Sequence, residues 1–197
     1  MNKQRFWGLK LKIALPEVQS SRIETFFCIK GKNTGYLNKT MKTPKNEPTE
    51  QQLELIKALC VNVFDKLREH SGAAIKINSI FRGPQLNKHI GGSKTSQHCV
   101  GLDPKLNSYG AAIDIDDEYW KRGVNKMNNT EMGYWIKDNL DFDQIIFEVP
   151  INGYPSWIHV SYRPDGKNRK QALIYINKKY IPYVGNEHLI KNPDLDK

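Results

Sequence analysis

The sequence contains only three cysteines among its 197 residues, and no two of them form a C-x-x-C pair. An odd number of cysteines in this arrangement argues against a disulfide scaffold and against a cysteine-ligated zinc site. Cys60 falls on the apolar face of a predicted helix, so we expect it to be a core residue. Cysteine chemistry is therefore not expected to carry the function.

Long hydrophobic runs are also absent. No stretch approaches the roughly 20 apolar residues that a membrane-spanning helix needs. In the basic start, MNKQRFWGLKLKIALPEV, Lys10 and Lys12 interrupt the apolar residues and no clean cleavage site follows, so we expect no secretory signal. The sequence has no evident repeat, and its hydrophobic fraction of 39% argues against disorder.

Basic residues are in excess. Thirty lysines and arginines against 21 acidic residues give a net charge of +9, which indicates an anionic partner such as nucleic acid, acidic lipid or bacterial cell wall. The lysines are scattered, and neither a helix-turn-helix nor an aromatic RNA-binding motif occurs, so nucleic acid is the weaker interpretation.

The length fits one domain with an additional segment. We treat residues 1–45 as an N-terminal extension of unknown role, in which 12–18 and 22–31 could be strands. Residues 46–180 form the predicted main domain, and 181–197 a polar C-terminal tail.

Within the main domain, Thr49 and Gln52 have the spacing of a capping box that opens a helix ending at the Ser-Gly of 71–72. A second helix over 131–140 is predicted to be capped by Thr130. Alternating or apolar runs predict strands, at 73–81, 110–116, 143–149, 157–162 and 172–177. The pattern predicts an α+β fold with a mostly antiparallel sheet.

Three residues suggest a metal site. A catalytic zinc commonly has three histidine or carboxylate ligands and keeps a fourth position for water. His98 lies in a polar loop, Asp114 in a predicted strand, and His159 in a strand whose alternation places it on one face with Trp157 and Ser161. A single histidine in a strand is more often structural, and a single aspartate at a strand end is more often a cap, so the residues alone leave both interpretations open.

Several short motifs occur in order: SIFRGPQLNKHIGGSKTSQH, GAAIDI, DQIIFE and WIHVSY. Together they resemble the zinc D-Ala-D-Ala carboxypeptidases, the murein peptidases with a hedgehog-type fold, over about residues 45–175. The resemblance implies that His98, Asp114 and His159 bind Zn²⁺. It also implies that Arg82 grips or polarises the substrate and that Ser96 contacts it at the mouth of the site.

The chain departs from the family pattern between the first two implied ligands. The family places its histidine and aspartate seven residues apart, whereas His98 and Asp114 are sixteen apart, and Lys105 occupies the seventh position. We interpret the difference as a loop insertion that leaves both halves of the motif intact. Asp116, on the same predicted strand face, is the rival ligand, and Asp103 is a more distant one.

A second departure concerns the general base. Many relatives have an acidic residue three positions before the last histidine, where this chain has Ser156. Glu148 ends the preceding strand and is the nearest alternative, and it would then act on the water at the zinc.

The implied function is zinc-dependent hydrolysis of peptidoglycan stem peptides, by a carboxypeptidase or an endopeptidase. The small size fits a phage-type lysis or virion enzyme, monomeric, made in the cytoplasm and acting on the wall after release. The alternatives are a non-catalytic wall-binding or virion structural module and, less favoured, a nucleic-acid-binding protein.

Overall fold

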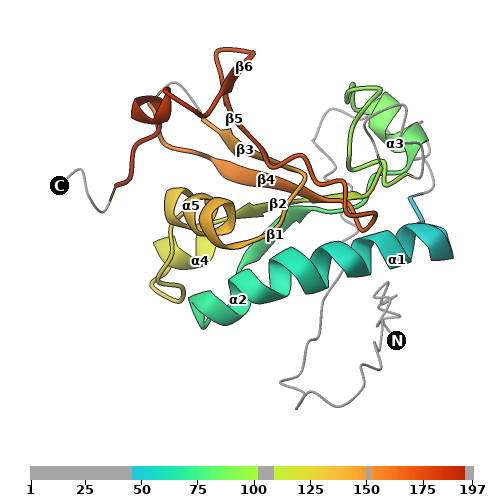
Figure 1. The fold of residues 1–197 in the computed structure, drawn as a ribbon, viewed down its shortest axis with the longest axis horizontal. Helices are drawn as coiled ribbons and strands as arrows, with labels where there is room; N and C mark the ends of the chain where they lie inside the picture. Colours follow the sequence, from blue (N-terminus) through green and yellow to red (C-terminus); the bar gives the residue numbers. More distant parts are fainter. Residues whose placement is uncertain (1–45, 102–108, 150–151, 194–197) are drawn as a thin grey trace, which may run out of the picture.

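The computed structural model describes residues 46–101, 109–149 and 152–193. The predicted strands at 12–18 and 22–31 and the rival ligand Asp103 lie outside these residues. The described chain has an α+β architecture, as expected, with a mixed six-stranded sheet packed against helices (Figure 1). Among the residues that the structure describes, no helix combines the length and apolar character that crossing a bilayer requires.

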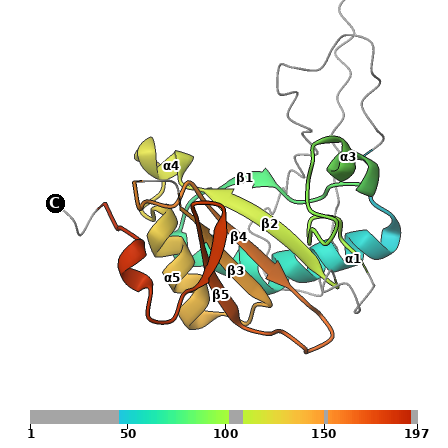
Figure 2. The same ribbon diagram turned by 90° about the horizontal axis from the view of Figure 1, so that it is seen from above.

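The elements follow in this order: α1 (Glu50–Leu59), the π-helix η1 (Cys60–Phe64), α2 (Asp65–Ser71), β1 (Lys76–Ser79), α3 (Pro84–His89), β2 (Ala111–Asp116), α4 (Glu118–Lys121), α5 (Asn129–Asn139), β3 (Gln144–Glu148), β4 (Trp157–Tyr162), β5 (Gln171–Ile176), β6 (Lys179–Pro182) and the 3₁₀-helix η3 (Glu187–Leu189). Figures 1 and 2 show α3 at one end of the molecule and α4 and α5 at the other.

The first helix begins where its capping box predicts. The Thr49 hydroxyl accepts from the Gln52 backbone N–H, and the Gln52 side chain accepts from the Thr49 N–H at 2.9 Å. The helix runs to residue 71, but five residues in its middle, Cys60–Phe64, form a π-helix that the sequence pattern does not predict. Its apolar face is buried, including Ile56, Leu59, Cys60, Val63, Phe64 and Leu67.

The strands have the order β1-β2-β4-β3-β5-β6 (Figure 2). Four of the five pairings are antiparallel, and β3 pairs with β5 in parallel. The parallel pairing arises because the chain leaves β4 and returns on the far side of β3, so that β5 does not form a hairpin with β4.

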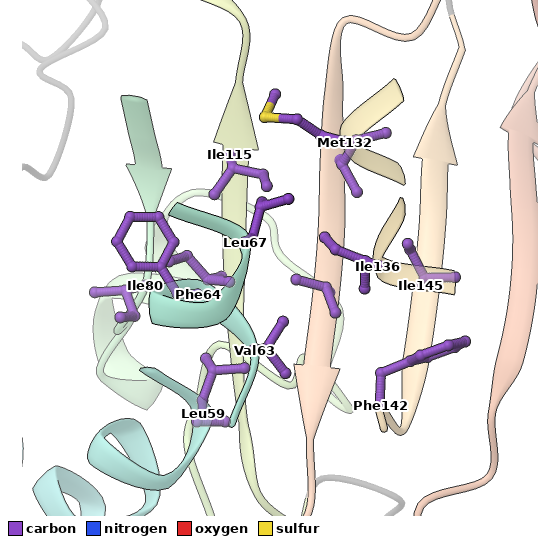
Figure 3. Close-up of a cluster of buried hydrophobic side chains, with 14 of the residues drawn as sticks. Leu59, Val63, Phe64, Leu67, Ile80, Ile115, Met132, Ile136, Phe142 and Ile145 are labelled. Carbon is purple, nitrogen blue, oxygen red and sulfur yellow. The ribbon is translucent and has the colours of Figure 1, made fainter. Parts of the chain in front are cut away.

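The core lies between one face of this sheet and the helices. Ile115 of β2 and Ile145 of β3 contribute from the sheet, Leu67 of α2 and Ile136 of α5 from the helices (Figure 3). Side chains alternate along each strand, so the residues between these apolar ones lie on the opposite face. Burying each large apolar side chain contributes roughly 1.5–3 kcal/mol, which fixes the strands and hence the residues on the other face.

Two expectations need correction. The N-cap of α5 is Asn128, whose side-chain oxygen accepts from Glu131 N and whose backbone N–H donates to the Glu131 carboxylate. Thr130 is instead buried and donates to the Lys191 carbonyl at 2.7 Å. The strand expected over 73–81 is shorter, spanning Lys76–Ser79, and its pairing with β2 contains a register shift between Ile77 and Ser79.

The C-terminal segment packs on the domain. The strand β6 spans the boundary expected at residue 180, and Ile190, in the segment expected to be a polar tail, is buried in the core. The Asn192 side chain accepts a hydrogen bond from Asn128 at 2.9 Å, which ties this segment to the start of α5.

Candidate metal centre

His98, Asp114 and His159 come together on the sheet face opposite α1, α2 and α5. One ligand atom of each lies within 4.8 Å of the others. Asp114 of β2 is the direct cross-strand partner of His159 in β4, so both side chains share this face. His98 reaches it from the loop after α3. Asp114 Oδ2 lies 3.1 Å from His98 Nε2, and Asp114 Oδ1 lies 2.9 Å from His159 Nδ1.

The loop that carries His98 is held by hydrogen bonds that its backbone carbonyls accept from other segments. Arg82 N donates to the His98 carbonyl at 2.8 Å, and Gln52 Nε2 at the start of α1 donates to the Val100 carbonyl at 2.8 Å. Buried backbone carbonyls need such partners, so these bonds fix the position of the loop. The same Gln52 therefore caps the first helix and secures the loop of the candidate ligand.

Two glycines that flank the additional residues between His98 and Asp114 lie next to each other in the structure. Gly101 and Gly110 form an antiparallel bridge, in which Gly110 N donates to Gly101 O at 3.1 Å. Gly110 has φ +99°, and a Cβ there would lie 2.2 Å from the Tyr162 carbonyl, so only glycine fits. The two ends of the additional segment are thus hydrogen-bonded to each other, and Asp114 keeps its place in β2.

The protonation states of these residues suit a cation. Burial lowers the pKa of His98, which favours the neutral imidazole. Burial alone would raise the pKa of Asp114, but the neighbouring His98 and His159 outweigh it and hold the pKa of this carboxyl well below its usual range. A neutral histidine and an ionised carboxylate are the forms that bind metal.

The contacts of His98 leave one ring nitrogen available to a metal ion. The Ile80 carbonyl can only accept, so its 3.2 Å contact with His98 Nδ1 requires the proton on Nδ1. The lone pair of the neutral ring is then on Nε2, facing a carboxylate oxygen 3.1 Å away. Two acceptors this close repel unless a metal ion lies between them or the ring takes up a second proton, and burial of His98 disfavours that second proton. Two histidines and one carboxylate are also a frequent ligand set of catalytic zinc.

Arg82 lies beside this group. Its guanidinium Nη2 is 3.9 Å from Asp114 Oδ2, and Nη1 donates to Asn87 Oδ1 at 3.5 Å. Asn87 is buried and donates to the Ser93 carbonyl at 2.8 Å. Gly92 permits this arrangement, since a Cβ at that position would lie 2.1 Å from Asn87 Oδ1. The predicted substrate arginine is therefore oriented at the edge of the ligand group.

Glu148 lies on the same sheet face. It is the cross-strand partner of Trp157, two residues from His159, which places it diagonally across from that histidine. Its side chain is half-buried, and burial raises the pKa of Glu148 to about 7; His159 opposes the rise and Asp114 adds to it. A carboxyl with a pKa near neutrality can both take up and release a proton at physiological pH.

The remaining predicted residues lie farther from the group. Asp116, the rival ligand, forms a salt bridge with Lys76 at 3.1 Å and accepts from Glu118 N at 2.8 Å. Ser96 is half-buried in the loop before His98, where its backbone N–H donates to Ser93 and its carbonyl accepts from Cys99. Asp114, and not Asp116, is therefore the carboxylate next to the two histidines.

The polar residues that support the candidate ligands were not predicted from the sequence. Gln52, Asn87 and the buried Gln97 each hold a segment or side chain of the group, and Gln97 Oε1 lies 3.1 Å from His159 Nε2. Their only signals in the sequence are a glutamine in the capping box, an asparagine in α3 and the glutamine of Ser-Gln-His. None of these indicates its partner.

Comparison with known proteins identifies the family. A model of the family described as peptidase M15 matches residues 30–140, which is more than half of the chain, whereas no curated protein and no solved structure matches. The matched region includes His98 and Asp114 and ends before β3, so Glu148 and His159 lie beyond it. Peptidases of this family depend on zinc, and the His-Asp-His group is one that could hold such an ion. The chain belongs to the peptidase M15 family.

Proposed function

We propose that the protein is a zinc-dependent peptidase that hydrolyses peptide bonds in bacterial peptidoglycan stem peptides, as a D-Ala-D-Ala carboxypeptidase or as a murein endopeptidase. The observation that carries the proposal is the convergence of His98, Asp114 and His159 beside Arg82 and Glu148 on one sheet face. The M15 membership supports the peptidase chemistry.

The zinc ligands in this proposal are His98 through Nε2, Asp114 through its carboxylate and His159 through Nδ1. Bound zinc supplies a Lewis acid that acidifies a coordinated water and polarises the scissile carbonyl. The strands hold two of the ligands, and the loop fixed by Gln52 holds the third, so the donor atoms are positioned before the ion arrives.

Glu148 is the proposed general base and acid. It takes a proton from the attacking water and delivers it to the leaving amine. Its half-buried position supports this role, because burial favours the protonated carboxyl that the second transfer needs. Ser156 stands where many relatives have an acidic residue, and it has no carboxylate that could act as this base.

Arg82 is the proposed substrate residue. Its guanidinium is permanently charged and carries several donors in one plane, which suits a peptide carboxylate or a carbonyl that develops negative charge. Ser96 is proposed as a further polar contact at the mouth of the site. A carboxylate anchored on Arg82 would favour cleavage next to the end of a stem peptide.

Digestion of purified peptidoglycan by the zinc-loaded protein, with and without a chelator, tests the proposal. Mass spectrometry of the products separates loss of a terminal alanine from cleavage of crosslinks. Glu148→Gln is expected to retain zinc and to lose about 10²–10⁴-fold in turnover. Chelator-sensitive products that disappear in this variant would establish the peptidase.

Two other outcomes distinguish the alternatives. Zinc-loaded protein that sediments with peptidoglycan of several wall types but cleaves none of them would favour a non-catalytic wall-binding or virion structural module. Binding to DNA with a steep dependence on salt concentration, together with no affinity for the wall, would favour a nucleic-acid-binding protein.

A further inference from the structure

Behind His159, on the side away from Asp114, lies a chain of hydrogen-bonded polar residues, of which the first two are buried. His159 Nε2 contacts Gln97 Oε1 at 3.1 Å, and Gln97 Nε2 donates to Asp143 Oδ2 at 3.0 Å. Arg169 donates to Asp143 from Nε at 2.8 Å and from Nη2 at 2.6 Å. Gln97 is 8% exposed and Asp143 is 0% exposed, so the bond between these two side chains is shielded from water, whereas Arg169 reaches Asp143 from the surface.

The direction of each hydrogen bond follows from the chemistry of its members. The Asp143 carboxylate also accepts from Arg169 N at 3.2 Å, so both of its oxygens face N–H donors of Arg169 and act as acceptors. Gln97 must therefore present its NH₂ group to Asp143, which leaves its carbonyl oxygen facing His159. Because that oxygen can only accept, His159 must donate from Nε2.

A neutral histidine with its proton on Nε2 has its lone pair on Nδ1. Nδ1 is the atom that lies 2.9 Å from Asp114 Oδ1, within the ligand group. We infer that Gln97, Asp143 and Arg169 are positioning residues that select the tautomer of His159 and direct its Nδ1 lone pair at the metal. The inference rests on the proposed zinc site and extends it by three residues that touch neither metal nor substrate.

The arrangement shows how an amide can take the place of a carboxylate next to the histidine. Metal-bound histidines commonly donate their other N–H to a carboxylate, a backbone carbonyl or water. Here the carboxylate of Asp143 does not contact His159 itself. Arg169, in the segment before β5, fixes Asp143, and Asp143 in turn fixes the orientation of the Gln97 amide. An amide has two possible orientations, and Asp143 removes the wrong one.

Zinc affinity, measured by competition with a chelator, tests the inference. Gln97→Leu keeps the approximate size of the side chain but accepts no hydrogen bond, and it is expected to weaken zinc binding about 10–100-fold. With Co²⁺ as the probe, the visible absorption of the variant should also differ from that of the wild type. Gln144→Leu is the matched control, because Gln144 is a β3 glutamine bonded to Gln171 and should bind zinc as the wild type does.

Exchanging the amide of Gln97 with the carboxylate of Asp143 separates the positioning role from simple packing. Gln97→Glu alone places two carboxylates together, and Asp143→Asn alone removes the group that orients the amide, so each should weaken zinc binding. In the double variant Q97E/D143N the new carboxylate accepts from His159 and from the asparagine amide. The double variant should recover to within about threefold of the wild-type affinity.

The outcomes distinguish this inference from the proposed function. A wild-type protein with no affinity for zinc overturns both. A wild type that binds zinc, with a folded Gln97→Leu of equal affinity and an unchanged Co²⁺ spectrum, overturns the inference and leaves the function standing. Circular dichroism establishes folding. If Gln97→Leu does not fold, a folded double variant that stays as weak as its parents overturns the inference, and recovery supports it.

Discussion

At the scale of single residues, two aspartates on the same strand illustrate how the fold separates a ligand from a structural ion pair. Asp114 and Asp116 both point away from the core, but Asp114 lies opposite His159, whereas Asp116 pairs with Lys76 at the edge of the sheet. Cross-strand register, which the sequence does not display, makes the difference.

The first prediction uses this pair. Asp114→Asn removes the carboxylate between the two histidines and should reduce zinc affinity by at least about 100-fold, a larger loss than for residues outside the ligand group. Asp116→Asn is the control and should bind zinc within about threefold of the wild type, because the ion pair that it loses, with Lys76, lies outside the ligand group. Isothermal titration with zinc measures both. Equal losses in the two variants would contradict the assignment of Asp114.

Glu148 allows a prediction about pH that does not depend on catalysis. Burial raises its pKa from 4.5 to about 7, so the folded, metal-free protein holds this proton more tightly than the unfolded chain does. The resulting contribution to the free energy of unfolding is fully present below the unfolded pKa, near 4.5, and is lost as the pH rises through about 7.

Urea unfolding of metal-free wild type and Glu148→Gln measures this contribution. The variant cannot ionise at this position, so its stability relative to the wild type should rise between about pH 5 and about pH 8. A difference that stays constant over that range would mean that the Glu148 carboxyl titrates alike in the folded and unfolded chains.

At the scale of elements, the bridge between Gly101 and Gly110 reconciles the long spacing with the family pattern. His98 to Gly101 reads H-x-x-G, and Gly110 to Asp114 reads G-x-A-x-D. The two glycines are hydrogen-bonded, so the two half-motifs meet in space although they are separated in sequence. Removing residues 102–110 would give H-x-x-G-x-A-x-D, with the seven-residue spacing.

That deletion is the third prediction. Joining Gly101 to Ala111 should leave the midpoint of thermal unfolding close to that of the wild type and zinc affinity within about tenfold, since shortening a closed loop changes its entropy only slightly. Differential scanning calorimetry and zinc titration measure the two quantities. Gly110→Ala in the full-length chain is the contrasting variant, expected to be destabilised by its clash with the Tyr162 carbonyl. Loss of folding in the deletion alone would contradict the interpretation.

At the scale of the whole molecule, the candidate ligands come from parts of unequal stability. Asp114 and His159 belong to hydrogen-bonded neighbours in the centre of the sheet, whereas His98 belongs to a loop held by bonds from Arg82 and Gln52. A metal that joins the three therefore restrains the loop more than the sheet.

Hydrogen exchange tests this difference. Zinc should slow amide exchange in the loop around His98 and leave β3 and β5 nearly unchanged, and zinc at about 100 times its Kd should raise the free energy of unfolding by about 2.7 kcal/mol. A chelator should reverse both effects. Uniform slowing over the whole sheet would indicate that the metal acts elsewhere.

The sequence predicts the elements better than it predicts their partners. The Thr49 capping box and the alternation of 157–162 depend on neighbouring residues and can be read directly, so the first helix and the face of His159 follow from them. The contact between Gln97 and Asp143 joins residues 46 positions apart, and the parallel pairing of β3 with β5 depends on the path of a loop. Patterns of neighbouring residues do not predict such distant contacts.

The Asn128 cap shows the limit within local patterns as well. Asn128 and Glu131 have the capping-box spacing, but Thr130 is also a good capping residue. The Lys191 carbonyl decides between them, because it accepts the hydrogen bond of the Thr130 hydroxyl.

The Gly101–Gly110 bridge also makes this point of the chain a natural place for grafting. A foreign peptide, such as an epitope tag or the two halves of a fluorescent reporter, could replace the residues between the two glycines while both ends stay hydrogen-bonded. Each doubling of the inserted length would cost only about 0.6 kcal/mol. The length of this connection can therefore change without moving the three candidate ligands.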